Sequence, residues 1–72
     1  MSKGSPLVKV EVERETDGRW VAEVPALPGV LAYGATRQEA TTKVQALALR
    51  VLAERIENGE PTPELSGLFA AA

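Results

Sequence analysis

The segment V-P-A-L-P-G-V, residues 24–30, constrains the fold of this chain more than any other feature of its sequence. A proline cannot donate a hydrogen bond to a β-ladder, and the Pro-Gly pair is typical of a tight turn. Apolar and β-branched residues flank the segment on both sides, so it predicts a sharp corner between two antiparallel strands over residues 19–24 and 30–35. The residues of this corner motif are Pro25, Leu27, Pro28 and Gly29.

A strictly alternating run, P-L-V-K-V-E-V-E-R-E over residues 6–15, predicts a further strand ahead of the corner, with one apolar and one charged face. Asp17-Gly18 separates this run from the next one and is a strong hairpin signal, because glycine adopts a positive φ without steric cost. The three predicted strands therefore form a three-stranded antiparallel sheet.

The helix that follows has clear start and stop signals. T-R-Q-E, residues 36–39, fits a capping box in which Thr36 accepts from the Glu39 amide and Glu39 reaches back to the Thr36 amide. Asn58-Gly59 and the prolines beyond it end the helix. The predicted fold class is α+β, in the order β-β-β-α, with a possible short fourth strand in residues 60–72.

The length of 72 residues allows one small domain, whose hydrophobic core is marginal if the chain stands alone. Within this single domain, residues 1–6 are expected to be a flexible N-terminus and residues 60–72 a proline-containing tail. A marginal core favours an oligomer or a complex.

The predicted helix carries an apolar arc of roughly 200°, about twice the stripe that an ordinary amphipathic helix needs. A single sheet covers only part of such an arc, so either a second copy of the chain or the tail must cover the rest. We favour a homo-oligomer, most simply a dimer. The stripe expected to pack on the sheet consists of Ala40, Val44, Leu47, Ala48 and Val51. The residues left for the oligomer interface are Leu49, Leu52 and Ile56. The tail residues that could cover them instead are Leu65, Leu68 and Phe69.

The alternation of the sheet residues separates two faces. Small residues, Ala22, Ala32 and Gly34, mark the face that a helix approaches closely. The opposite face carries apolar and charged residues, which suits either a contact surface or a solvated outer face. The candidate partner face consists of Val21, Leu31 and Tyr33. The single tryptophan, Trp20, is interpreted as a core residue.

The composition gives few means of catalysis. The chain has neither histidine nor cysteine, so the commonest general base and the commonest ligands of transition metals are missing. Glu11, Glu13 and Glu23 occupy exposed strand positions, and the glycines match no phosphate-binding motif. We therefore expect no catalytic, cofactor-binding or metal site, and no enzyme.

The charge and hydropathy pattern bears on partners and location. A net charge of −2 and a pI of about 5.0 argue against a surface that neutralises phosphates, so no direct DNA binding is expected from this chain alone. No apolar run approaches the roughly 18 residues of a membrane span, and the start of the sequence shows no secretion signal. The expected location is the cytoplasm.

The sequence from residue 17 to residue 40 resembles the signature of the HicB-like antitoxin family. That signature is an aromatic-rich strand, a P-x-L-P-G corner, a strand ending in G-x-T, and Glu-Ala opening a helix. Here the last two are Gly34-Ala35-Thr36 and Glu39-Ala40. The resemblance covers roughly residues 7–58 and implies a reduced RNase-H-like domain without catalytic carboxylates. Valine stands at position 30, where many relatives have cysteine.

The resemblance implies a function as well. Members of the family bind and mask a small HicA-like toxin that cleaves mRNA, and many carry a C-terminal DNA-binding segment. Residues 60–72 are too few and too uncharged for such a segment, so the expected form is the single domain. The alternatives are an orphan structural or regulatory homo-oligomer without a toxin partner and, less favoured, an RNA-binding domain.

Overall fold

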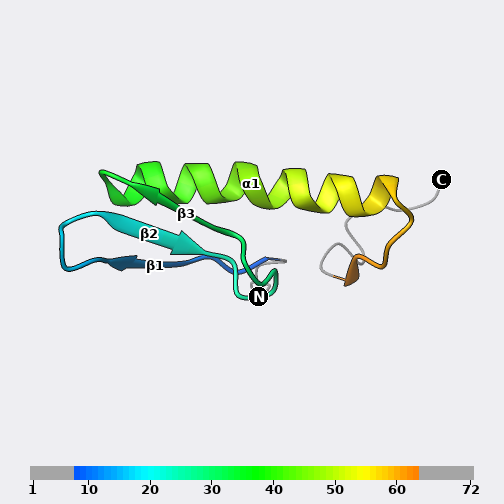
Figure 1. Cartoon of the computed structure of the whole chain (residues 1–72), viewed down its shortest axis with the longest axis horizontal. Helices are drawn as coiled ribbons and strands as arrows, with labels where there is room; N and C mark the ends of the chain where they lie inside the picture. Colours follow the sequence, from blue (N-terminus) through cyan, green and yellow to red (C-terminus); the bar gives the residue numbers. More distant parts are fainter. Residues whose placement is uncertain (1–7, 64–72) are drawn as a thin grey trace, which may run out of the picture.

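The computed structural model describes residues 8–63, which form a two-layer arrangement of one sheet and one helix (Figure 1). The strands pair antiparallel in the order β1-β2-β3, and the helix lies along one face of the sheet. This confirms the predicted α+β fold. In chain order, the elements are β1 Glu11–Arg14, β2 Trp20–Glu23, β3 Leu31–Gly34 and α1 Arg37–Glu57.

The hairpin between β1 and β2 closes where the Asp-Gly pair predicts it. The Gly18 amide donates to the Glu15 carbonyl (2.9 Å), and Gly18 has a φ of 92°. The Glu15 amide donates to the Arg19 carbonyl (2.7 Å), which leaves a three-residue loop with glycine in the left-handed region. Asp17 accepts from the Arg19 amide at 3.0 Å and so fixes the exit of the turn.

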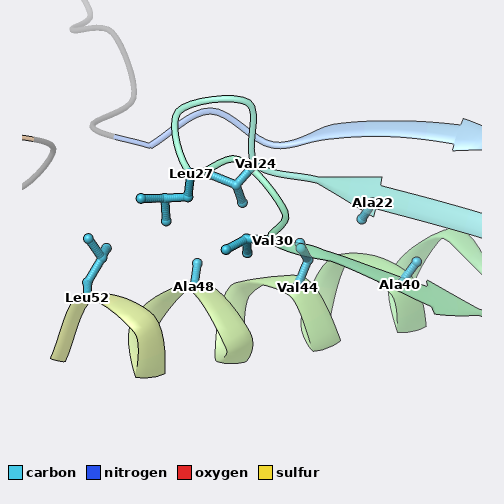
Figure 2. Close-up of a cluster of buried hydrophobic side chains, with 8 residues drawn as sticks. All are labelled: Ala22, Val24, Leu27, Val30, Ala40, Val44, Ala48 and Leu52. Carbon is cyan, nitrogen blue, oxygen red and sulfur yellow. The ribbon is translucent and has the colours of Figure 1, made fainter. Parts of the chain in front are cut away.

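The corner between β2 and β3 consists of two consecutive β-turns. The Leu27 amide donates to the Val24 carbonyl, and the Val30 amide donates to the Leu27 carbonyl, both at 2.9 Å. Each turn has a proline as its second residue, and Gly29 adopts a φ of 88° in the second turn, as a type II turn requires. Leu27 is shared by both turns, and its side chain is fully buried. The two turns therefore place the Leu27 side chain against the helix (Figure 2).

Both ends of α1 are capped. Thr36 Oγ1 accepts from the Glu39 amide at 3.0 Å, as predicted, but Glu39 Oε1 accepts from the Ala35 amide at 2.6 Å. The closest partner of the Glu39 carboxylate is therefore the Ala35 amide, and the predicted partner, the Thr36 amide, is a weaker one that also lowers the pKa of Glu39. At the other end Gly59 has a φ of 73°, and its amide donates to the Ile56 carbonyl while the next amide, of residue 60, donates to the carbonyl of residue 55. This is a Schellman motif.

The core lies between the sheet and α1 and continues past the strands beneath the corner (Figure 2). On the helix, the buried residues follow a single i, i+4 row. Each fully buried leucine or valine stabilises the fold by about 1.5–3 kcal/mol. The buried residues are Ala22, Val24, Leu27, Val30, Ala40, Val44, Ala48 and Leu52.

This arrangement corrects one part of the sequence prediction. Leu52 was expected on the uncovered side of the helix, yet it is 2% exposed and points toward Leu27 (Figure 2). The prediction considered only the strands as cover for the helix and did not include the corner. Leu47 and Val51, expected on the sheet stripe, are half-buried against the core.

The strands are shorter than predicted, because the alternating pattern continues beyond the paired residues. Val8 and Val10 lie outside β1, although both pack against the core. The expected flexible residues 1–6 and the docking residues of the tail, from 64 onward, lie outside the described part of the chain.

Candidate functional site: the outer face of the sheet

The sheet has one face that α1 does not cover, which we call the outer face. Its residues alternate with the buried ones along each strand: Val21 lies opposite Tyr33, and Ala22, its neighbour in β2, is fully buried beneath the helix. The sequence therefore assigned the two faces correctly. The residues of the outer face are Lys9, Glu11, Glu13, Arg19, Val21, Glu23, Leu31 and Tyr33.

The structure brings the predicted partner residues together as one apolar patch over β2 and β3. Val21 and Tyr33 are directly paired, and Leu31 lies two residues from Tyr33 on the same strand. Tyr33 is 40% exposed and Leu31 is 41% exposed, while Val21 is half-buried between its neighbours. Exposed large apolar side chains grouped in this way are typical of contact surfaces.

The side chain of Arg19 lies against the ring of Tyr33. The sequence analysis did not predict this contact. The Arg19 guanidinium carbon lies 4.5 Å from the centre of the Tyr33 ring, within the range of a cation–π contact. Arg19 Nε donates in turn to Asp17 Oδ2 at 2.8 Å. The backbone amide of Arg19, and then its side chain, hold the pKa of Asp17 below its ordinary value. The hairpin turn thus positions the arginine that lies on the tyrosine.

The other side of the outer face is acidic. Glu11 of β1 lies directly opposite Glu23 of β2, and Glu13 lies opposite Val21. Like charges directly across two strands are unfavourable. Lys9 Nζ approaches Glu11 Oε2 at 3.7 Å, but both side chains are largely exposed, so this ion pair contributes little. An open hollow of about 340 Å³ lies over β1 and β2, lined by Glu11, Val12, Glu13, Val21 and Glu23.

A second cluster of arginine and aromatic side chains lies at the other face of the hairpin. Trp20 is half-buried rather than fully within the core, and two guanidinium carbons lie near its ring centre: Arg14 at 5.9 Å and Arg37 at 5.8 Å. Arg14 is the cross-strand neighbour of Trp20, so the register of the hairpin is sufficient to predict this contact. The helix start supplies Arg37, which only the tertiary arrangement places there.

The remaining sequence predictions concern the structural motif, the oligomer interface and metal binding. Gly34 permits the close approach of β3 and α1, since a Cβ there would lie 2.6 Å from the Ala40 amide nitrogen. Of the predicted oligomer residues, Leu49 is 64% exposed and Ile56 is 48% exposed. Within residues 8–63 no group of three or more histidine, cysteine or acidic side chains is arranged to hold a metal.

Comparison of the chain with protein-family models, curated proteins and solved structures finds no match. No helix in the described residues is long and apolar enough to cross a membrane.

Proposed function

We propose that this chain is a non-enzymatic protein-binding module of the antitoxin type, which masks a small HicA-like, mRNA-cleaving toxin through its outer face. The observation that carries the proposal is the uncovered apolar patch of Val21, Leu31 and Tyr33 beside three glutamates. The HicB-like pattern of the corner and the capped helix supports the same interpretation.

The composition of the outer face favours a basic partner. Glu11, Glu13 and Glu23 present an excess of carboxylates, which attract a cationic surface and speed its association. The apolar patch next to them supplies the desolvated centre that a stable contact needs, and tyrosine is among the residues that dominate such contacts. A protein that binds RNA has a basic surface, so this face would compete with RNA for it. The proposed role places the protein in the cytoplasm.

The proposal is tested with the product of a short reading frame adjacent to the gene, if it encodes a small basic protein. We expect the purified chain to bind this protein and to stop its cleavage of RNA, while the chain alone cleaves none. Replacing Tyr33→Ala should weaken binding at least about tenfold, because an aromatic anchor contributes about 2 kcal/mol or more. Leu49→Ala, an exposed substitution on α1, is the matched control and should leave binding unchanged.

Two outcomes would contradict the proposal. If Tyr33→Ala and Leu49→Ala inhibit the toxin as well as the original chain does, the outer face is not the binding surface. If the adjacent protein neither binds nor cleaves RNA, the antitoxin interpretation fails, and the orphan homo-oligomer becomes the better one. Specific RNA binding by the chain alone would favour the RNA-binding alternative.

A further inference from the structure

The exposed apolar side chains of α1 form a stripe beside its buried row, and Ile56 is the next position of that row after Leu52. Leu49 is 64% exposed and Ile56 is 48% exposed, with exposed Ala53 between them. The spacing of four and then three residues places these side chains on one side of the helix, over two turns. The described residues leave this stripe, Leu49-Ala53-Ile56, open.

We propose that this stripe packs on the same stripe of a second copy, with the two helices antiparallel about a two-fold axis near Ala53. Such an axis places Leu49 of one chain against Ile56 of the other, and repeats the contact symmetrically, as an isologous interface requires. The small side chain of Ala53 lies next to the axis, where it allows the two helices to approach closely. The order of large, small and large side chains makes the stripe complementary to itself.

The charges beside the stripe match the same arrangement. Arg50 and Glu57, seven residues apart, lie on the flank of α1 next to Leu49 and Ile56. In an antiparallel pair this flank faces its own copy, so Arg50 of one chain comes level with Glu57 of the second chain. The ion pairs within residues 8–63 join other residues, which leaves these two side chains available.

This dimer goes beyond the proposed binding function and does not depend on it. The stripe and the outer face of the sheet lie on different sides of the molecule, so pairing of the helices leaves both outer faces open. The assembly would present two copies of the proposed binding face. Because the helix contact is short, we expect a reversible dimer that dissociates on dilution.

The first test measures the oligomeric state of the full chain by sedimentation velocity over a range of concentrations. We expect a concentration-dependent dimer that is lost in the double variant Leu49→Glu, Ile56→Glu. Gln38→Glu adds a negative charge at an exposed position of the same helix, outside the proposed overlap, and should leave the dimer intact. Arg50→Glu should weaken the dimer, and adding Glu57→Arg to that variant should restore it.

The second test fixes the direction of pairing, because the chain has no cysteine of its own. Ala53→Cys should form a disulfide-linked dimer under mild oxidation. Leu49→Cys alone should not, since the two copies of position 49 would be about 10 Å apart along the helix axis. An equimolar mixture of Leu49→Cys and Ile56→Cys should cross-link between the two variants. Circular dichroism of each variant confirms that the fold is retained.

Three results would overturn the proposal. The first is a chain that stays monomeric at high concentration. The second is cross-linking of Leu49→Cys as efficient as that of Ala53→Cys, which means parallel pairing. The third is a monomer that dimerises only after Leu68→Ser and Phe69→Ser, which identifies the tail of the same chain as the cover of the stripe.

Discussion

Removing the side chain of Leu27 should cost this protein a large part of its stability. Leu27 is fully buried beneath the corner, and the two prolines and three turn hydrogen bonds around it leave the backbone little freedom to collapse into a cavity. Leucine-to-alanine changes in cores destabilise proteins by about 2–5 kcal/mol, and poor collapse favours the upper part of that range. We therefore expect Leu27→Ala to lower the free energy of unfolding by about 3–4 kcal/mol.

The magnitude is decisive because the total stability is small. A domain of this length has a free energy of unfolding of about 4–11 kcal/mol. The loss should lower the melting temperature by roughly 12–30 °C, since each kcal/mol shifts it by about 4–8 °C in a domain of this size. Urea unfolding followed by circular dichroism gives the free energy, and the fluorescence of Trp20 gives a second probe. Both should report one transition.

The matched control is the same chemical change at an exposed position. Leu49→Ala should change the free energy of unfolding by no more than about 0.5 kcal/mol, measured at a concentration where the chain is monomeric. Leu52→Ala should resemble Leu27→Ala, because the two side chains point toward each other (Figure 2). If Leu27→Ala costs less than about 1 kcal/mol, or no more than Leu49→Ala, the corner does not anchor the helix and the reasoning fails.

Two further predictions concern the sheet–helix contact and the helix cap. Gly34→Ala should destabilise the fold by about 1–3 kcal/mol or more in thermal unfolding, because its Cβ would meet the backbone of Ala40 at 2.6 Å. Gly29→Ala is the control, since the space around Gly29 is open but its φ is 88°, and it should cost only about 1–2 kcal/mol. A larger loss for Gly29→Ala than for Gly34→Ala would contradict the packing argument. The Ala35 amide, and then Lys43, hold the pKa of Glu39 below its ordinary value, so the stabilisation is present above the unfolded pKa and is lost as the pH falls through the folded one. The difference in stability between the original chain and Glu39→Gln should therefore shrink when urea titrations are repeated from about pH 6 down to about pH 3, and a constant difference would exclude this role of the carboxylate.

Local chemistry in the sequence determined the turns and the helix ends. Prolines restrict φ and lack a donor, and glycine adopts positive φ, so the corner, the hairpin loop and the end of α1 at Glu57 follow from residues a few positions apart. The alternation of side chains along β2 and β3 likewise separated the buried Ala22 from the exposed Tyr33. These features depend on interactions that the chain makes with its own neighbours in sequence.

Other features were decided only by tertiary structure, because they depend on where distant segments meet. A helical wheel gives the order of the side chains around α1 but does not tell which segment covers each of them. The corner extends the core beyond the strands and buries Leu52, whereas Leu49 and Ile56 stay exposed. The helix start likewise brings Arg37 to Trp20 across the fold. The apolar pattern fixed which residues prefer burial, whereas the position of Leu27 above the helix decided which of them are buried.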